Sequence, residues 1–511
     1  MTTATDMLAS DFATLPDLIA AHARERGDKT AIASDDGSIT YADLDAAMDR
    51  VTAALQRDDV VPGTAIAIVA APTIDYAVVV LGTLRAGCVA APIAPSATPV
   101  SIAAMIADCG APILFVDAAN AAMLAGQPIE AHIVEFDRTF ADWIAPEGMT
   151  PMQVARAPAD GFNIIYSSGT TGTPKGIVQS HAMRWSHIAR NAAANFGEAV
   201  TMIATPLYSN TTLVSFLPTL GWGGTVVLMK KFDAHRYLRL AERHRATHTM
   251  LVPVQYQRIM ALPDFDAFDL ASFRLKTSTS APFAAALKAD VLARWPGVLL
   301  EYYGMTEGGA STALNATEFP DKLHTVGQPL PGHDLRLIDD DGNEVPPGAM
   351  GEVVGRSPTM MTGYHGRADA TRDAEWHDAA GNRYIRHGDV GQFDDDGFLI
   401  LMDRKKDLII SGGFNIYPTD LEAVLAQHEA TGDCAVVGVP SAAWGETPVG
   451  FYVARPGFEQ ADAGAIMAWT NERLGKTQRL SQLHRIDDMP RSAIGKILKR
   501  ELRDTLSGAM A

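Results

Sequence analysis

The sequence predicts a large N-terminal α/β domain with mostly parallel sheets, a β-rich subdomain after it, and a small α+β C-terminal domain. In the first part of the chain, short runs rich in β-branched residues alternate with helical patterns, as in βαβ units. After about residue 330, short strands are separated by Gly and Asp turns. With 511 residues and 47% hydrophobic content, the chain is long enough for at least two domains with large cores.

The alternation of strand and helix is clearest in two segments. An Ala-Ile-Ala-Ile-Val run over residues 65–69 predicts a buried strand, and a helical pattern follows over residues 74–85. Further along, residues 224–229 and 249–252 predict strands that flank a helix over residues 234–245. Because strands joined by helices pair in parallel, these segments predict a largely parallel sheet.

Two clusters of aspartate lie in the β-rich region, at residues 339–341 and 394–396, and a glycine follows each. Clustered carboxylates can hold a metal ion, but Asp-Asp-Gly between apolar strands is typical of a tight turn. We therefore interpret both clusters as turns.

The last hundred residues have a pattern of their own. They predict, in order, a helix over 419–427, strands over 435–439 and 450–454, a helix over 463–474, a strand over 483–487 and a helix over 496–506. Just before this region, an apolar strand runs into the charged segment Asp403-Arg-Lys-Lys-Asp407. We place the domain boundary there, which gives domains over residues 1–402 and 408–511.

Net charge and cysteine content narrow the classes of function. A formal charge of −18 argues against a nucleic-acid-binding surface, although it is compatible with a local basic site for a phosphate ligand. Cys88, Cys109 and Cys434 are too few and too widely spaced for a disulfide framework or a metal site. No basic segment followed by an apolar one opens the chain, and no apolar stretch is long enough to span a bilayer. We therefore expect a cytoplasmic protein. We also expect it to be a monomer or a homodimer.

The most informative segment is the loop Tyr166-Ser-Ser-Gly-Thr-Thr-Gly-Thr-Pro-Lys-Gly176. Its glycines permit positive φ and let backbone N–H groups converge on an anion, its hydroxyls donate hydrogen bonds, and Lys175 adds a full positive charge. This chemistry suits a polyphosphate. A P-loop NTPase places its lysine between Gly and Ser or Thr, whereas here Pro174 precedes Lys175 and Gly176 follows it, so a Walker-type site is disfavoured. Apolar runs on both sides of the loop argue against a flexible linker.

This loop resembles the signature of the acyl-adenylate-forming superfamily, which includes acyl-CoA synthetases, adenylation domains of nonribosomal peptide synthesis and luciferases. Further motifs of that family follow in the expected order. They are Tyr303-Gly-Met-Thr-Glu307, Gly351-Glu-Val-Val-Gly355, Tyr384-Ile-Arg-His-Gly-Asp-Val-Gly391, Asp403-Arg-Lys-Lys-Asp407 with Ser411-Gly-Gly-Phe-Asn-Ile-Tyr-Pro418, and Pro490-Arg-Ser-Ala-Ile-Gly-Lys496. Weaker matches reach toward the N-terminus at residues 40–44 and 81–87.

The resemblance implies a two-step reaction. A carboxylate attacks the α-phosphate of ATP to give an acyl-adenylate and pyrophosphate, and a thiol, commonly that of coenzyme A, then displaces AMP. Because the first step brings two anions together, it needs Mg²⁺ and a positioned lysine. Glu307 is the implied ligand of Mg²⁺, Thr306 the implied contact of the α-phosphate, and Lys496 the implied lysine of adenylation. The residues implied to bind ATP are Ser167, Ser168, Gly169, Thr170, Thr171, Gly172 and Lys175 at the phosphates, Ser280, Ala281, Pro282 and Tyr303 at the adenine, and Asp389 and Arg404 at the ribose.

The resemblance also implies that the C-terminal domain takes two arrangements. Residues 403–407 become the hinge, with its pivot at Lys406. In one arrangement Lys496 supports adenylation; in the other it withdraws, and a segment of Ser411, Gly412 and Gly413 lines a pantetheine tunnel. The residues implied to contact the nucleotide and phosphates of coenzyme A are Trp444, Arg479 and Arg85.

The substrate pocket departs from common patterns of the family. Many relatives with aromatic or fatty substrates have histidine where this chain has Ser209, and Ser280 stands where glycine or alanine is frequent. Amino-acid activators usually have an aspartate at the position of Ser209, so an α-ammonium group would lack its partner here. The mixture of small and polar residues favours a compact acid, of the aryl, arylpropenoic or medium-chain kind. The implied lining residues are Tyr208, Ser209, Thr211, Gly304 and Gly309.

Other functions of the same family stay open at this point. A stand-alone adenylating enzyme would load the acid onto a carrier-protein thiol, and luciferase chemistry shares the first step. A catalytically inactive relative would have lost some of the reactive set, whereas Lys175, Glu307, Asp389, Arg404 and Lys496 are all present. We therefore expect an ATP-dependent carboxylic acid–CoA ligase that uses ATP, Mg²⁺ and coenzyme A.

Overall fold

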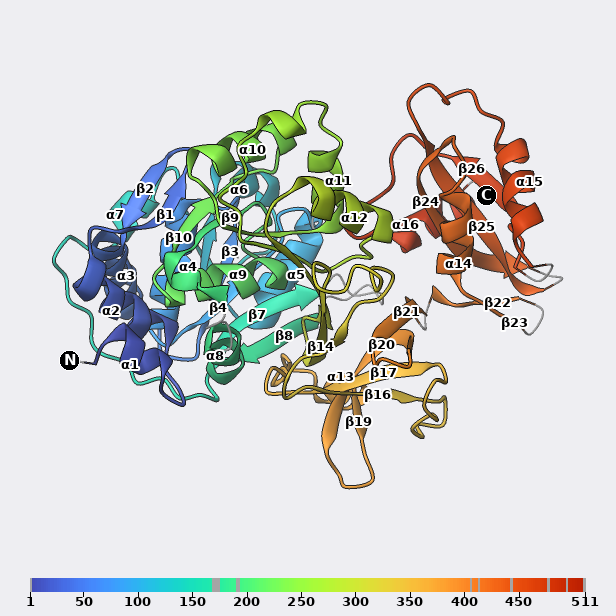
Figure 1. Cartoon of the computed structure of the whole chain (residues 1–511). Coiled ribbons are helices and arrows are strands. Elements are labelled where there is room, and N and C mark those ends of the chain that lie inside the picture. The colour runs from blue at the N-terminus through green and yellow to red at the C-terminus, as the bar shows by residue number, and fades with distance from the viewer. Residues whose placement is uncertain are drawn as a thin grey trace. The chain divides into compact units, whose positions relative to one another are not determined.

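A computed structural model describes residues 2–167, 175–189, 194–404, 407–411, 414–441, 444–475, 478–492 and 495–508 (Figure 1). The chain forms two compact units. Unit 1 consists of Met1–His324, Pro329–Asp334 and Gly355–Ile385, and unit 2 of Thr325–Gln328, Leu335–Val354 and Arg386–Ala511. The large α/β unit and the smaller C-terminal α+β region confirm the predicted fold class.

Sheet A of unit 1 is mostly parallel. In the described residues its strand order is β15-β14-β13-β12-β11-β9-β10-β1-β2. Its inner neighbours from β1 to β13 pair in parallel, while β1 with β2 and β13 with β14 form antiparallel hairpins. The strands are β1 (Thr30–Ser34), β2 (Gly37–Thr40), β9 (Val200–Ile203), β10 (Thr225–Leu228), β11 (His248–Leu251), β12 (Leu275–Ser278), β13 (Val298–Met305), β14 (Gly308–Asn315) and β15 (Gln328–Pro329).

Sheet B of unit 1 has the order β18-β8-β7-β4-β3-β5-β6 in the described residues. Its β3–β6 region is parallel, and β8 pairs antiparallel with both β7 and β18. The strands are β3 (Ala65–Val69), β4 (Val89–Pro92), β5 (Ile113–Val116), β6 (His132–Glu135), β7 (Gly161–Ser167), β8 (Lys175–Ser180) and β18 (Gly363–Tyr364). The antiparallel edge of this sheet therefore carries both ends of the loop in the segment Tyr166–Gly176.

Helices share one hydrophobic core with both sheets of unit 1. Side chains of α2, α3, α4, α8 and α9 are buried in the same cluster as residues of β3 and β10. A second cluster holds α5 against the opposite side chains of β3, since alternate residues of a strand face opposite ways. The helices are α1 (Ala4–Leu8), α2 (Leu15–Arg26), α3 (Tyr41–Arg57), α4 (Ile74–Arg85), α5 (Pro99–Cys109), α6 (Ala118–Leu124), α7 (Phe140–Trp143), α8 (His181–Ala189), α9 (Asn210–Gly221), α10 (Ala234–Arg243), α11 (Pro253–Met260), α12 (Ala285–Arg294) and α13 (Ala368–Asp373).

The C-terminal residues of unit 2 form an α+β layer. Strand order is β23-β22-β25-β24, with β26 paired in parallel to β25. These elements are β22 (Ile409–Ser411), β23 (Phe414–Ile416), α14 (Pro418–Leu425), β24 (Thr431–Ser441), β25 (Gly445–Ala454), α15 (Ala463–Arg473), β26 (Gln482–Arg485) and α16 (Lys499–Gly508). The β-rich region before them, whose residues are divided between the two units, contains β16 (Asp334–Ile338), β17 (Gly351–Arg356), β19 (Glu375–His377), β20 (Arg383–Phe393) and β21 (Leu399–Arg404).

Both aspartate clusters form turns, as interpreted from the sequence. Asp339 accepts hydrogen bonds from the backbone N–H groups of Asp341 and Asn343 at 3.0 and 2.8 Å. Asp394 does the same for Asp396 and Phe398, at 3.0 and 2.8 Å. The carboxylates of Asp339 and Asp394 therefore bind local backbone N–H groups.

One predicted helix begins later than expected. The pattern predicts a helix from residue 496, whereas α16 starts at Lys499. Ile497 instead forms an antiparallel bridge with Arg491, and the N–H of Leu498 donates to the carbonyl of Pro490 at 2.8 Å. Lys496 therefore lies outside α16.

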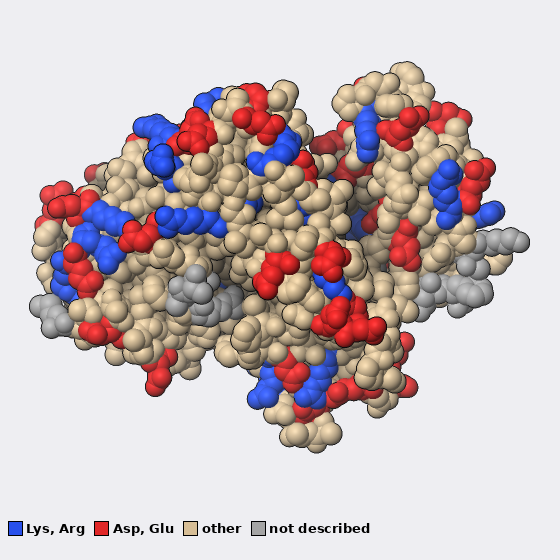
Figure 2. All heavy atoms as spheres, in the orientation of Figure 1, with Lys and Arg blue, Asp and Glu red and all other residues tan. Residues whose placement is uncertain are grey.

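Charged side chains of both signs are interspersed on the face of the molecule seen in Figure 2. Among the described residues, no helix combines the length and apolarity needed to cross a membrane.

Candidate active site

β7 and β8 pair antiparallel and flank the loop of the segment Tyr166–Gly176. Ser167 lies opposite Lys175 and Tyr166 opposite Gly176, so the two ends of the loop are paired. Gly176 has a different role from the one expected, since it is required by packing and not by a positive φ: a Cβ there would lie 2.8 Å from Cγ2 of Ile164. Ser168, Gly169, Thr170, Thr171 and Gly172 lie outside the described residues.

Lys175, Tyr364 and Glu307 form a short chain of contacts beside this loop. Nζ of Lys175 lies 5.0 Å from the ring centroid of Tyr364, a cation–π distance. Oη of Tyr364 donates a hydrogen bond to Oε1 of Glu307 at 3.0 Å. Burial, followed by the charge of Glu307, raises the pKa of Tyr364, so the phenol stays a donor at neutral pH.

Thr306 and Glu307 form the turn between β13 and β14, where Met305 pairs with Gly308. Gly308 has φ +82°, and a Cβ there would lie 1.7 Å from the carbonyl oxygen of Thr359, so only glycine fits. The carbonyl of Thr306 accepts a hydrogen bond from Nε2 of Gln179 on β8 at 2.7 Å. Sheet A's turn is thereby attached to sheet B's loop-bearing hairpin, in the region where Figure 1 shows β14 beside β7 and β8.

This arrangement fits the implied magnesium ion. Mg²⁺ in nucleotide sites typically takes one or two carboxylates and completes its shell with phosphate oxygens and water. Glu307 offers one carboxylate, held in place through Oε1 by Tyr364. The described residues contain no group of three or more His, Cys, Asp or Glu that could hold a metal without such additional ligands.

The residues implied to line the acid pocket stand at the start of α9. We call residues 208–211 the acid segment, and it contacts the segment that begins at Ser280. Ser209 precedes α9 and is 7% exposed, and Thr211 in the first turn is 5% exposed. Oγ1 of Thr211 lies 2.5 Å from Oγ of Ser280, so these two hydroxyls are hydrogen-bonded. Ser280, expected at the purine, thus directs its hydroxyl toward the acid segment, and Ala281 and Pro282 follow it. Tyr208 is half-buried beside Ser209.

Ser280 has φ +83°, in the left-handed region that favours glycine. We expect the Ser280→Gly variant to be more stable than Ser280→Ala by about 1 kcal/mol, because both lack the hydroxyl but only alanine keeps the strained Cβ. Urea unfolding midpoints of the two variants measure the difference. At an unstrained position the order would reverse, so a more stable alanine variant would contradict the strain.

Tyr303, Gly304 and Gly309 flank the Thr306–Glu307 turn on β13 and β14. Tyr303 is 9% exposed and lies opposite Thr312 in the hairpin. The described residues of unit 1 that the resemblance implies for phosphate, adenine and acid therefore lie on elements joined by direct contacts.

The ribose residues implied by the resemblance lie in unit 2. Asp389 on β20 pairs directly with Arg404 on β21, which places the two residues side by side across the hairpin. The side chain of Arg404 and all of Lys406, the implied hinge pivot, lie outside the described residues.

The turn that carries Lys496 is held by Arg491. Nη1 of Arg491 donates to the carbonyl of Gly495 at 2.7 Å, and Nη2 contacts the carboxylate of Asp433 on β24 at 2.5 Å. The backbone N–H of Lys496 donates to Oγ of Ser492 at 3.1 Å, and Gly495 takes φ +78°. The side chain of Lys496 is exposed, and hydrogen bonds hold the backbone of Gly495 and Lys496.

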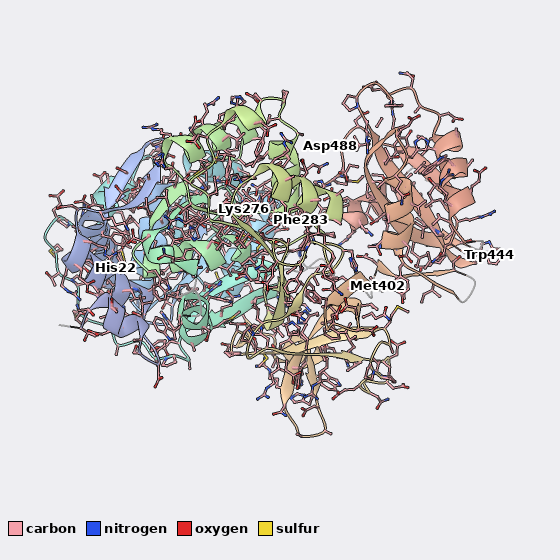
Figure 3. All side chains as sticks on the ribbon, viewed as in Figure 1. His22, Lys276, Phe283, Met402, Trp444 and Asp488 are labelled. Carbon is pink, nitrogen blue, oxygen red and sulfur yellow. The ribbon has the colours of Figure 1, made fainter. Side chains whose placement is uncertain are left out.

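Two of the implied coenzyme A residues lie at one end of the C-terminal sheet. Ser411 pairs with Gly445, so it is next to Trp444, which is 61% exposed and lies at the periphery of unit 2 in Figure 3. Arg479 is also exposed and precedes β26, whose partner β25 begins at Gly445. Gly412 and Gly413 lie outside the described residues.

Arg85 does not fit a phosphate-binding role. Its guanidinium forms ion pairs with Asp45 at 2.5 Å and Asp49 at 2.8 Å, and its side chain is 11% exposed. A phosphate would have to displace these carboxylates and approach them closely, which like charges oppose. We therefore do not assign Arg85 to the coenzyme A site.

Comparison with models of known protein families gives two matches that together cover most of the chain. The model of the AMP-binding enzyme family matches residues 19–365, and that of the AMP-binding enzyme C-terminal domain matches residues 420–496. The chain belongs to the AMP-binding enzyme family. It is an AMP-forming ligase of the acyl-adenylate-forming superfamily, as its relatives show.

Curated relatives and solved structures match this AMP-binding enzyme over nearly its whole length. The 4-coumarate–CoA ligase-like protein 9 of Oryza sativa subsp. japonica is 32% identical and covers 97% of this chain and 93% of its own. The fatty acid–[acyl-carrier-protein] ligase ScoC of Streptomyces coeruleorubidus is 29% identical, covering 96% of both. The crystal structure of ATP-bound MatB from Rhodopseudomonas palustris has a TM-score of 0.86 at 28% identity and covers 98% of this chain and 100% of its own.

Sequence reasoning missed Tyr364 and Gln179 of this AMP-binding enzyme. Tyr364 lies on a two-residue strand with no recognisable pattern, and only its pairing with β8 brings it to Lys175. Gln179 follows Lys175 by four residues on β8, and alternation along a strand could have placed both on one face.

Proposed function

We propose that this enzyme is a carboxylic acid–CoA ligase that acts through an acyl-adenylate: acid, ATP and CoA give acyl-CoA, AMP and pyrophosphate. The observation that carries the proposal is the contact between Lys175, Tyr364 and Glu307, in which Lys175 stands near the end of the loop over residues 166–176. Lysine and magnesium there would offset the charge of the phosphates while the carboxylate attacks. Thr306 would contact the α-phosphate, and Lys496 would add its charge during adenylation.

The acid is proposed to be compact and partly polar, of the aryl, arylpropenoic or medium-chain class. Support comes from the hydroxyls of Ser209, Thr211 and Ser280, which are polar groups in a largely buried segment. Buried hydroxyls favour a ligand that can form hydrogen bonds with them, because an apolar ligand would leave some of these groups unpaired.

Coenzyme A is proposed as the acceptor, with exposed Trp444 stacking on its adenine and Ser411 near the pantetheine arm. The second candidate is a carrier-protein thiol, which the likeness to ScoC favours. Both acceptors present a pantetheine thiol, so the two candidates share the first reaction step.

Incubation of the purified enzyme with ATP, Mg²⁺, CoA and a panel of carboxylic acids tests the proposal, with products identified by mass. Acyl-CoA with AMP and pyrophosphate is the expected result. ADP with phosphate would refute adenylation. Acyl-AMP that is not transferred to CoA, but is transferred to a pantetheinylated carrier protein, would favour the second candidate.

Replacement of Trp444 by alanine is expected to raise the KM for CoA about tenfold or more, since stacking on a base contributes on the order of 1–3 kcal/mol. Acid-dependent exchange of pyrophosphate into ATP should be unchanged. Steady-state kinetics with CoA as the varied substrate measures the effect. Phe458→Ala, at another exposed aromatic of unit 2, is the matched control and should leave both values unchanged.

A further inference from the structure

A buried arginine lies between the segments assigned to phosphate and acid. Arg184 belongs to α8 and is 0% exposed. Burial lowers its pKa to about 9, so it carries its charge at neutral pH. A buried cation is costly unless its environment is strongly polar, and this side chain has no part in the proposed chemistry.

Three neutral amides surround the guanidinium. Nε of Arg184 donates to Oδ1 of Asn163 at 3.0 Å, Nη1 donates to Oδ1 of Asn210 at 2.9 Å, and Nη2 donates to Oε1 of Gln179. These amides come from β7, from the first residue of α9 and from β8. One side chain therefore holds three elements of unit 1 together.

Because a guanidinium only donates, each amide must turn its oxygen toward Arg184 and its nitrogen elsewhere. The nitrogen of Gln179 accordingly donates to the carbonyl of Thr306 at 2.7 Å, next to Glu307. The nitrogen of Asn163 donates to Oε1 of Gln179 at 2.9 Å. Arg184 thus orients the amide of Gln179, whose N–H group holds the Thr306–Glu307 turn through the carbonyl of Thr306.

Asn210 is oriented in the same way. It is half-buried between Ser209 and Thr211, and its oxygen is directed to Arg184. Its two N–H donors therefore face away from the arginine, and the bond to a cation polarises the amide and strengthens them as donors. The acid segment thereby gains donors for an anion.

We propose that Asn210 binds the carboxylate of the substrate acid through its side-chain N–H group, and that Arg184 is the positioning residue that orients it. This inference rests on the proposed function, in which an anionic acid must approach the anionic phosphates. Arg184 orients Asn210 on the acid side and, through Gln179, the Thr306–Glu307 turn on the phosphate side. Its buried charge also lowers the cost of bringing both anions close together.

Two substitutions of Asn210 test the binding role by acid-dependent pyrophosphate exchange. Asn210→Ala should raise the KM for the acid about tenfold or more and leave the KM for ATP within about twofold, since a hydrogen bond to a charged group is lost. Asn210→Asp should be worse, because its carboxylate accepts from Arg184 equally well but presents negative charge to the acid. A near-normal KM for the acid in Asn210→Asp would overturn the binding role.

Substitutions of Arg184 test the positioning role. Arg184→Met should raise the KM for the acid and lower the exchange rate about tenfold or more, and Arg184→Lys should not restore them, because one nitrogen cannot serve three amides on three elements. A lysine variant with normal kinetics would overturn this role. Thermal unfolding reports whether Arg184→Met folds, and if it does not, the Asn210 pair decides the proposal.

Arg156→Met is the matched control for loss of a buried arginine in unit 1. Arg156 is 8% exposed at its side chain and contacts Asp17 and the carbonyl of Arg85, which belong to neither segment. It should lower the melting temperature without changing the KM for the acid. Absence of acid-dependent exchange in the wild-type enzyme would refute the proposed function itself, whereas normal exchange in every variant would refute this inference alone.

Discussion

Replacement of Lys496 by alanine is expected to lower the adenylation rate by about 10²–10³-fold, while transfer of the acyl group from supplied acyl-AMP to CoA stays largely intact. Removal of one charged group that stabilises the developing negative charge has an effect of that size. The exposed lysine lies on a turn held by Arg491 and Asp433, so its loss should leave the backbone unchanged. Pyrophosphate exchange and single-turnover thioester formation measure the two half-reactions separately.

Lys499→Ala is the control for this prediction. Lys499 lies three residues away and forms an ion pair with Glu422 at 2.9 Å within unit 2. Its removal should lower the melting temperature through loss of this largely buried ion pair and leave adenylation unchanged. Equal losses in both half-reactions of Lys496→Ala would contradict the proposal that the C-terminal domain alternates between two arrangements.

Replacement of Glu307 by glutamine is expected to lower adenylation by about two orders of magnitude and to raise the Mg²⁺ concentration needed for half-maximal rate. Glutamine keeps the size of the side chain and can still accept from Tyr364, but it lacks the charge that a magnesium ligand supplies. Titration of Mg²⁺ at saturating ATP and acid measures both effects. An unchanged Mg²⁺ requirement would remove Glu307 from the metal site.

Tyr364→Phe separates orientation of Glu307 from its charge. The variant loses one hydrogen bond to a carboxylate, which corresponds to about 1.5–3 kcal/mol. We expect a smaller loss of rate than in Glu307→Gln. The Mg²⁺ concentration needed for half-maximal rate should stay as in the wild-type enzyme. A loss as large as that of Glu307→Gln would mean that the phenol has a direct part in the reaction.

The fold could be predicted wherever local pattern and packing agree. The strand over 65–69 and the helix over 74–85 occur as expected, because apolar periodicity there matches full burial. The weak match at residues 40–44 also has a local cause, since Thr40 caps α3 by accepting from the N–H of Asp43 at 3.2 Å. The helix over 496–506 was wrong at its start because a bridge between Arg491 and Ile497, which propensity does not reveal, extends the backbone there.

The site could be predicted only where the residues stand in recognisable motifs. Lys175 and Glu307 belong to such motifs, and their side chains come together at Tyr364. Tyr364 itself, Gln179 and Arg184 act through contacts between elements distant in sequence, and no spacing along the chain encodes those contacts. For Arg85, the surrounding aspartates are visible in the sequence, but their approach to it depends on how α3 packs against α4.

The pKa values of all three cysteine thiols are raised, which bears on the chemistry of an acyl-adenylate-forming enzyme. Such mixed anhydrides acylate thiolates, not thiols. Cys88 and Cys109 are buried, and burial raises the pKa of Cys88 to about 11 and those of Cys109 and Cys434 above their usual value. All three sulfurs stay protonated at neutral pH. The three thiols are therefore poor nucleophiles toward an acyl-adenylate, and in the proposed reaction the reactive sulfur comes from the acceptor.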